Sequence, residues 1–351
     1  MARRFKVERA PAGGYVQASI VPAAVLLTFV LVAPLVVLAG VRPLEAYYYF
    51  LISPFTTYQG VIEVLVKSTP YLLTGAAVAL AFAGGYWNIG AEGQLYAGAV
   101  AAAWVGVIMA GWPAVIAIPV LVLASGAAGA LWALGPAWLK ARLAVDEVVT
   151  TLLLNPVMLF LVSALLNGPW RDPVTHWPQS PTIALSAQMP RLLPQTRLHL
   201  GFPIALGVLA AVWWVLNRTS FGLKARAVGL GTASARFLGV KVEQVTLGVA
   251  LASGFMAGLA GGGEVAGIHF HLIEALSPGY GYSGIIIAML GGLRAGGVGL
   301  AALFFGLLGT GAQTMSRALG VPAYLGDIVQ ATILLLMLAM LLLRSYRVRC
   351  V

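Results

Sequence analysis

The sequence predicts an all-α integral membrane protein with about ten transmembrane helices, some of them broken or re-entrant. Of its 351 residues, 60% are hydrophobic and only 9% are charged. Soluble domains carry about 25% charged residues, so this chain lacks the polar residues to cover a water-facing surface of normal size. Its apolar runs also approach or exceed the length of about 20 residues that a spanning helix needs. Both observations place the chain in the membrane class.

The expected spans follow one another with mostly short connections; they are 18–41, 62–83, 92–111, 113–136, 147–167, 199–216, 243–263, 281–293, 297–316 and 324–343. The run 281–293 is short and bounded by glycines, so we interpret it as a half-helix or re-entrant piece. The first run is longer than the core of a cleavable signal peptide, about 7–15 residues, and we expect it to be retained. We therefore expect an N-terminal segment over 1–17, a single transmembrane domain over 18–343 and a tail over 344–351.

The placement of the basic residues predicts the orientation in the cell (inner) membrane. The net charge is +10, but Lys and Arg lie between the apolar runs, as membrane-topology determinants do, and this argues against nucleic acid as a partner. With ten crossings, fifteen basic residues lie on the predicted inner segments and six on the outer ones. Both termini are therefore predicted to be cytoplasmic. The Pro- and Trp-rich loop 168–198 is then an outer cap, and the loop 217–241 is cytoplasmic.

The segment 84–94, Gly-Gly-Tyr-Trp-Asn-Ile-Gly-Ala-Glu-Gly-Gln, is polar and glycine-rich between two apolar runs. Irregular backbone at membrane depth is tolerated only where it is buried in protein or lines a water-filled cavity, so we predict a broken helix. Two interpretations stay open. Asn88 caps the next helix with Glu92 in its first turn, or the break presents Asn88, Glu92 and Gln94 to a polar solute while Trp87 stacks on a ring.

A second glycine-rich break, over 279–302, resembles the first one, over 84–103. The two are five crossings apart in the expected topology, so the halves would have opposite orientations. Inverted repeats with interrupted helices are a recurring plan in transporters, and we predict such a repeat here. Next to Gly279 and Gly281, Tyr282 and Ser283 are candidates for the lining of the outer mouth of a solute pathway.

Two further polar groups lie near helix ends. Glu264 and His269 precede His271 and Glu274, a combination that could hold a metal, but a metal site needs a third or fourth ligand with outer support. We therefore expect no metal, and we place Glu264 and His269 on the outer mouth of the pathway.

In the segment 146–155, Asp-Glu-Val-Val-Thr-Thr-Leu-Leu-Leu-Asn, two acidic residues open a helix, where they are favourable. Asn155 lies two turns further on, just ahead of Pro156. Its amide bonds either a kinked backbone or a solute, and both interpretations stay open.

The loop 217–241 predicts a basic amphipathic helix with an apolar face; the residues available for that face are Phe221, Leu223, Val228, Leu230 and Phe237. The chain has no Gly-x4-Gly-Lys phosphate loop, because no Gly-Lys pair occurs in it. It also lacks the His-Glu-x-x-His and Gly-x-Ser-x-Gly motifs of hydrolases. We therefore expect no enzyme activity and no bound cofactor, and any energy for pumping must come from another subunit.

These motifs together resemble one known family. Asn-Ile-Gly-Ala-Glu-Gly-Gln at 88–94 resembles the signature of ATP-binding-cassette (ABC) importer permeases for simple sugars and nucleosides, a family that also includes branched-chain amino acid and ribose permeases. The segment 146–155 is similar to that family's Thr-x-Met-Leu-Asn segment, with Leu153 where Met is common. The segment 221–229 resembles its cytoplasmic coupling loop, and 277–292 resembles its second-half motif.

The resemblance implies a permease subunit, closest to the nucleoside branch, that pairs with an identical or homologous permease. Two cytoplasmic ATPase subunits would hold ATP and Mg, and an extracytoplasmic solute-binding protein would deliver the solute. The residues it assigns to ATPase coupling are Phe221, Gly222, Lys224, Arg226, Ala227, Gly229, Ala233, Arg236 and Gly239. The alternative is a secondary transporter of a small polar solute driven by an ion gradient, which the scarcity of membrane-embedded acids disfavours.

Overall fold

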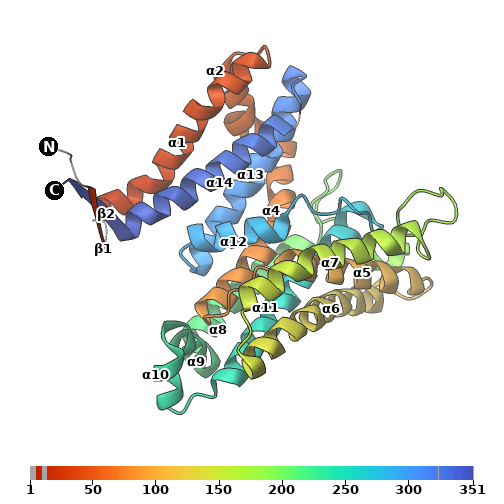
Figure 1. The fold of residues 1–351 in the computed structure, drawn as a ribbon. Helices are drawn as coiled ribbons and strands as arrows, with labels where there is room; N and C mark the ends of the chain where they lie inside the picture. Colours follow the sequence, from red (N-terminus) through yellow and green to blue (C-terminus); the bar gives the residue numbers. More distant parts are fainter. Residues whose placement is uncertain (1–4, 10–13, 323, 351) are drawn as a thin grey trace. The chain divides into compact units, whose positions relative to one another are not determined.

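The computed structural model describes residues 5–9, 14–322 and 324–350, and most of them are helical (Figure 1). The chain forms two compact units. One contains Met1–Val64 and Leu307–Val351, and the other contains Leu65–Gly306. Helices α4 and α13 each contribute residues to both units, and every site described below lies within the second unit.

The helices before the 168–198 loop are α1 (Gly14–Leu38), α2 (Pro43–Tyr47), the π-helix η1 (Tyr48–Ile52), α3 (Ser53–Thr56), α4 (Tyr58–Ala83), α5 (Ala91–Ile108), α6 (Ala114–Leu143) and α7 (Glu147–Asn167). The later elements are the 3-10 helix η2 (Leu185–Ala187), α8 (Gly201–Arg218), α9 (Ser220–Leu230), α10 (Thr232–Phe237), α11 (Val242–Glu264), the π-helix η3 (Val265–His269), α12 (Tyr280–Leu290), α13 (Ala295–Leu319) and α14 (Tyr324–Ser345).

Two short strands modify the all-α expectation. Strand β1 (Phe5–Arg9) pairs antiparallel with β2 (Tyr346–Cys350), with Phe5 opposite Cys350. In this first unit α1 and α14 run side by side and lead to the paired strands (Figure 1). The described parts of the two chain ends are therefore hydrogen-bonded to each other.

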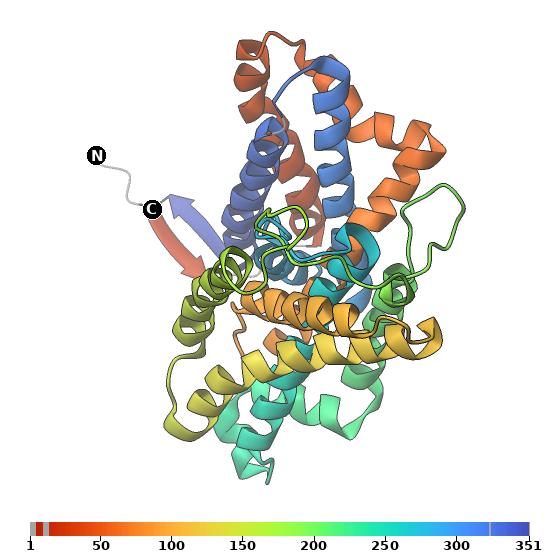
Figure 2. The ribbon, with the colours of Figure 1, turned by 90° about the vertical axis from the view of Figure 1, so that its right-hand side faces the viewer.

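Glycine allows the central helices of the second unit to touch through their backbones. A Cβ added at Gly98 would overlap the carbonyl oxygen of Gly258, and one at Gly129 would overlap the carbonyl oxygen of Gly254. Gly254 and Gly258 are four residues apart and so lie on one face of α11, where small residues permit close helix approach in membranes. Helices α5 and α6 both pack on α11 and lie side by side in both views (Figures 1 and 2).

The helices confirm a multi-pass membrane architecture, whereas the number ten stays a prediction. Each of the ten expected spans coincides with a helix. Among the described residues six helices are long and apolar enough to cross a membrane, namely α4, α6, α7, α8, α11 with η3, and α13. A seventh is counted if α1 and the segment Pro43–Thr56, which bends from it by 118°, form one broken span. Helix α12 has 11 residues, in keeping with the half-length piece expected there.

The loop 217–241 forms two helices, so the prediction of one amphipathic helix is wrong. Helix α9 ends at Leu230, and α10 begins at Thr232. Gly231 lies between them, and its amide donates to the carbonyl of Ala227. The expected apolar face is also divided. Val228 is buried, but Leu230 and Phe237 are each 91% exposed. Residues predicted for a single face therefore point both into the protein and out to its surface.

The 168–198 loop is an ordered cap over the end of α11. The amides of Ser180, Ile183 and Met189 donate to the carbonyls of Leu272, Phe270 and Ala266 at 2.8–3.0 Å. The Trp170 ring also stacks on Trp104 of α5, with centroids 5.2 Å apart. The loop is therefore ordered, as its proline and tryptophan content predicted, and backbone hydrogen bonds and the stacking of Trp170 hold it in place.

Candidate functional site

The predicted helix break is present, and its irregular part covers residues 84–90. Helix α4 ends in a Schellman motif, in which the amide of Gly85 donates to Phe82 and that of Tyr86 donates to Ala81, each at 3.0 Å. Gly85 has φ +73°, a conformation that glycine adopts without strain. Residues 86–90 have no regular structure, and α5 begins at Ala91.

Helix α7 supplies the hydrogen bonds that the broken backbone has lost. The amide of Ile89 donates to Thr151 Oγ1 at 3.1 Å, and its carbonyl accepts from Asn155 Nδ2 at 2.9 Å. Asn155 Oδ1 accepts from the amide of Gly93 at 2.9 Å. Asn155 therefore bonds the irregular backbone of a neighbouring segment. A bond to irregular backbone is one of the two interpretations left open above, and the structure shows that this backbone belongs to a neighbouring segment.

Glu147 extends the same polar face of α7 at its N-terminal end. Its carboxylate lies 2.6 Å from Lys140 Nζ and 3.5 Å from the amide nitrogen of Trp87. Glu147, Thr151 and Asn155 are spaced four residues apart and so share one helix face. The helix start predicted here is confirmed, because Asp146 accepts bonds from the amides of Val148 and Val149.

Asn88 and Gln94 bond each other across the break. Asn88 Nδ2 donates to Gln94 Oε1 at 2.9 Å, and Gln94 Nε2 donates to Asn88 Oδ1 at 3.0 Å. Asn88 also donates to Ser253 Oγ of α11, and both amides are buried. The residue that caps α5 is Gly90, so the capping role expected of Asn88 is wrong; its Oδ1 instead accepts from the amide of Gly90 at 2.9 Å. Trp87 is 47% exposed.

Glu92 joins the two glycine-rich breaks. Its Oε2 accepts a bond from the amide of Gly281 at 2.6 Å, and the side chain is buried. The approach needs glycine, because a Cβ added at Gly281 would overlap the backbone nitrogen of Glu92. The carboxylate therefore lies at the N-terminus of α12, where the helix dipole favours negative charge.

The segment before α12 is held on α5 by two further residues that the sequence did not single out. Tyr96 Oη donates to the carbonyl of Glu274 at 2.7 Å and accepts from the amide of Ser277 at 3.1 Å. Ser277 Oγ in turn accepts from the amide of Tyr280 at 2.9 Å.

The polar spacing of Glu147, Thr151 and Asn155 on α7 could have been found in the sequence. No local pattern indicates the contacts of Tyr96.

The remaining predicted pathway residues lie at the ends of α11 and α12. Glu264 is the last residue of α11, and its Oε2 is 3.8 Å from His269 Nε2, across the π-helix η3. Tyr282 is 39% exposed, whereas Ser283 is buried. In the part of the chain that the structure describes, no three His, Cys, Asp or Glu side chains form a group able to hold a metal ion.

A buried histidine packs against η3. The ring of His199 fills the space beside Gly267, and its Nδ1 accepts a bond from the amide of Gly201 at 3.0 Å. Its Nε2 is buried and has no hydrogen-bond partner among the residues that the structure describes. Burial, with a smaller contribution from the charge of Arg197, lowers the pKa of His199 to about 4. The imidazole is therefore neutral at physiological pH.

The predicted coupling region touches the helix break directly. A Cβ added at Gly229 of α9 would overlap the carbonyl oxygen of Ala83, and one at Gly85 would lie 2.9 Å from Gly229 Cα. Gly222 is as closely packed against the carbonyl of Val215 in α8. Glycine at position 229 therefore lets the backbone of α9 touch the end of α4.

The other predicted coupling residues are distributed over α9, α10 and the turn that follows. Phe221 is half-buried, and its ring lies beside Gly248 of α11. Gly239, with φ +80°, turns the chain after α10. Four side chains are exposed, namely Lys224, Arg226, Ala233 and Arg236, and Ala227 is half-buried.

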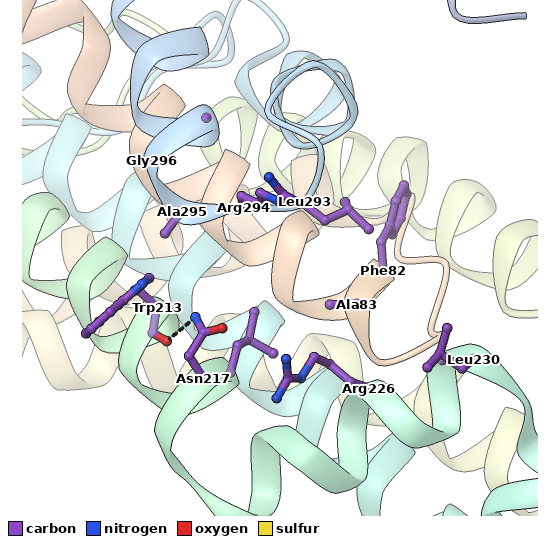
Figure 3. Close-up of a pocket in the computed structure, with 13 residues that line it drawn as sticks. Phe82, Ala83, Trp213, Asn217, Arg226, Leu230, Leu293, Arg294, Ala295 and Gly296 are labelled. Atoms are coloured by element: carbon purple, nitrogen blue, oxygen red, sulfur yellow. Dashed lines mark hydrogen bonds between the residues drawn. The ribbon is translucent and has the colours of Figure 1, made fainter. Parts of the chain in front are cut away.

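A cavity of about 780 Å³ lies beside this contact. It is enclosed by the ends of α4 and α8, by α9 and by the turn into α13 (Figure 3). The lining residues are Phe82, Ala83, Trp213, Leu216, Asn217, Arg226, Gly229, Leu230, Leu293, Arg294, Ala295, Gly296 and Gly297. Two of them, Arg226 and Arg294, carry charge.

Comparison with known proteins matches the chain over most of its length. The family described as "branched-chain amino acid transport system / permease component" matches residues 60–338. A glucose ABC transporter permease of Haloferax volcanii is 37% identical over 319 residues, which cover 88% of this chain and 84% of that protein. A guanosine ABC transporter permease of Bacillus subtilis is 36% identical over 295 residues, with 82% of each chain covered. A nucleoside ABC transporter permease of Lactococcus lactis is 28% identical over 322 residues, covering 89% and 88%.

Proposed function

We propose, because this chain belongs to the permease-component family of branched-chain amino acid transport systems, that it carries a nucleoside or a simple sugar inward as the membrane subunit of an ABC importer. Relatives of 36–37% identity are named for glucose and for guanosine. The chemistry common to these solutes is a ring that bears several hydroxyl groups. Such a ring has polar edges for hydrogen bonds and apolar faces for contact with aromatic side chains.

The contact between Gly229 and the end of α4 carries the mechanism. An ATPase docked on α9 and α10 would move these helices when ATP binding closes the ATPase pair. Because the backbone of α9 touches Ala83 and Gly85 without intervening side chains, its displacement reaches the break directly. The break would then move relative to the central helices and alternate the access of the pathway.

The docking surface that we propose for the ATPase combines apolar and basic side chains. Leu230 and Phe237 are each 91% exposed and Leu238 is 75% exposed, and apolar residues exposed together are typical of a protein–protein interaction site. Lys224 and Arg236 are exposed on the same two helices. ATP and Mg would be held by that partner, and this chain would bind no cofactor of its own.

The solute would meet the exposed aromatic rings first. Trp87, within the first break, is 47% exposed, and Tyr282, in the first turn of α12, is 39% exposed. Aromatic faces stack on a base or on the apolar face of a sugar. Asn88 and Asn155 would act through the backbone groups that they bond, and Gln94 would act through the side chain of Asn88. Glu264, His269 and Ser283 remain the proposed lining of the outer mouth.

The remaining parts of the proposal concern assembly and topology. We place both termini in the cytoplasm, a second identical or homologous permease beside this one, and a solute-binding protein outside. The bond between Glu92 and Gly281 links the two glycine-rich breaks, as expected if they are equivalent parts of an inverted repeat. Fifteen of the basic residues lie on the inner side in this topology, in agreement with the positive-inside rule.

Uptake by proteoliposomes tests the proposal. The chain is reconstituted with its candidate ATPase, second permease and binding protein, and the uptake of labelled guanosine and labelled glucose is measured with and without ATP. We expect ATP-dependent uptake of one of these classes. Uptake by this chain alone, driven by an imposed ion gradient without ATP, would support the secondary-transporter alternative.

A further inference from the structure

The cavity beside Gly229 holds two arginines on different elements. Arg226 comes from α9 and Arg294 from the turn that leads into α13, and both side chains line the cavity (Figure 3). The third polar side chain is Asn217, whose Nδ2 donates to the carbonyl of Trp213 at 2.8 Å. The cavity therefore contains two full positive charges, and no acidic residue is among its lining residues.

Neither guanidinium is neutralised within the described part of the chain. No hydrogen bond or ion pair of Arg226 or Arg294 side-chain atoms occurs among the described residues. Both arginines are exposed. Two like charges that face the same open cavity repel each other, and an anion that contacts both reduces this repulsion. The planar fork of a guanidinium also matches the oxygen geometry of a phosphate.

The start of α13 adds donors to the same cavity. Ala295, Gly296 and Gly297 line it, and the amides of the first helical turn have no partner within the helix. The positive end of the helix dipole also favours an anion there. A Cβ added at Gly296 would meet no described atom beyond its chain neighbours and its own helix backbone within 4 Å, so an anion has room beside this backbone.

Apolar side chains complete the lining, and they suit an amphipathic ligand. Phe82, Leu230 and Leu293 also line the cavity. Trp213 is 48% exposed near the end of α8, and tryptophan is enriched at membrane–water interfaces. Basic pockets between membrane helices on the cytoplasmic side bind anionic lipid headgroups. We propose that this cavity binds a phosphate group, carried either by an anionic phospholipid of the cytoplasmic leaflet or by a soluble phosphate compound.

The proposal that the phosphate belongs to a lipid of the cytoplasmic leaflet rests on the orientation proposed above. The proposal that the cavity binds a phosphate group rests only on the residues that line it. An occupant would touch Gly229 and the end of α4. It would therefore lie against the contact that we propose for coupling. Binding is independent of the transported solute, so failure of the transport proposal would leave the test below unaffected.

Native mass spectrometry of the purified, delipidated full chain tests the lipid source. The probes are phosphatidylglycerol and, separately, phosphatidylcholine. We expect phosphatidylglycerol to bind at one tight site, and we expect the double variant Arg226→Gln/Arg294→Gln to bind it about tenfold or more weakly, as for lost charge-assisted bonds. The control is Arg142→Gln/Arg218→Gln, which removes the same charge from exposed positions outside the cavity and should leave this affinity unchanged.

Calorimetric titration with sodium phosphate tests the soluble source. Phosphate binding that depends on both arginines, without a tight phosphatidylglycerol site, would assign the cavity to a soluble phosphate compound. Equal binding of the two lipids with no phosphate binding would overturn the proposal, as would wild-type affinity for either probe in the double variant. If the double variant elutes abnormally on size exclusion, the single variants Arg226→Gln and Arg294→Gln answer the same question.

Discussion

Glu92 and Gly281 are 189 positions apart in the sequence, yet the carboxylate Oε2 of Glu92 accepts the backbone amide of Gly281 at 2.6 Å. Glu92 lies in the first turn of α5, and Gly281 lies in the first turn of α12. The bond therefore joins the N-terminal ends of these two helices through one carboxylate. The two glycine-rich breaks therefore form one structural unit. Any rearrangement that separates them must break this bond or move both helices together.

Removing the Glu92 carboxylate should reduce transport more than it reduces the amount of protein in the membrane. Glu92→Ala leaves the buried amide of Gly281 without an acceptor, at a cost of about 1–3 kcal/mol, whereas Glu92→Gln keeps an oxygen at that position. We expect the uptake rate per molecule to fall most in Glu92→Ala and less in Glu92→Gln. Uptake and membrane abundance are measured on the same cells.

The control for this pair is Glu243→Ala, which removes an exposed carboxylate from the first turn of α11. It should leave both quantities close to those of the wild type. Equal losses of uptake and abundance in Glu92→Ala would show that the carboxylate serves folding alone.

Small side chains at two glycines of α9 should have different effects. Gly229→Ala places a methyl group against the carbonyl of Ala83, so we expect α9 to be displaced from the break and ATP hydrolysis to continue with reduced uptake. Gly222→Ala meets the backbone of α8 at Val215, and we expect lower membrane abundance. The measurements are ATPase activity and uptake of the reconstituted complex, normalised to protein.

A third glycine of this loop provides the comparison. At Gly231 an added Cβ meets only Ser234, no closer than 3.7 Å, so Gly231→Ala should resemble the wild type. Normal coupling in Gly229→Ala would argue against a mechanical role for its contact with α4.

Asn155 should contribute strongly to stability because it satisfies two backbone groups of the break. Asn155→Leu would leave the amide of Gly93 and the carbonyl of Ile89 without their partner, and each lost buried bond costs about 1–3 kcal/mol. We expect a clearly lower Tm for the variant in detergent, measured by fluorescence-detected size exclusion after heating. Asn217→Leu, which removes an exposed amide that bonds its own helix, should change Tm little. Similar Tm values for the two variants would contradict the role given to Asn155.

Local patterns in the sequence predicted the helices and the position of the break. Apolar runs coincide with the helices of the structure. They could be predicted because the length and hydrophobicity of a run are read from neighbouring residues alone. The start of α7 at Asp146 and Glu147 also follows from helix electrostatics. The glycines and polar residues of 84–94 predicted an interrupted helix, because they disfavour a lipid-facing helix. The structure confirms the interruption over 84–90, whereas 91–94 form the first turn of α5.

The partners of the polar side chains could not be predicted in this way. Glu92 bonds Gly281, and Gly229 touches Ala83; both contacts depend on how distant helices pack, which no spacing in the sequence reveals. Asn155 was predicted to bond either a kinked backbone or a solute, and no local pattern indicated that this backbone would be that of Ile89. The division of the 217–241 loop at Gly231 was missed because its apolar residues were assigned to one continuous helix face.

Acidification should destabilise the protein through His199. Burial lowers the pKa of this imidazole from 6.5 to about 4, so the unfolded state takes up a proton first as the pH falls. The stability contributed by the neutral ring is therefore complete above pH 6.5 and is lost as the pH falls toward 4, by at most about 3 kcal/mol. We expect Tm to fall between pH 7 and pH 5 in the wild type. In His199→Asn, whose amide oxygen can still accept from Gly201, the fall should be clearly smaller. The control His176→Asn removes an exposed imidazole and should keep the wild-type dependence, whereas identical pH profiles for all three proteins would exclude His199 as the titrating group.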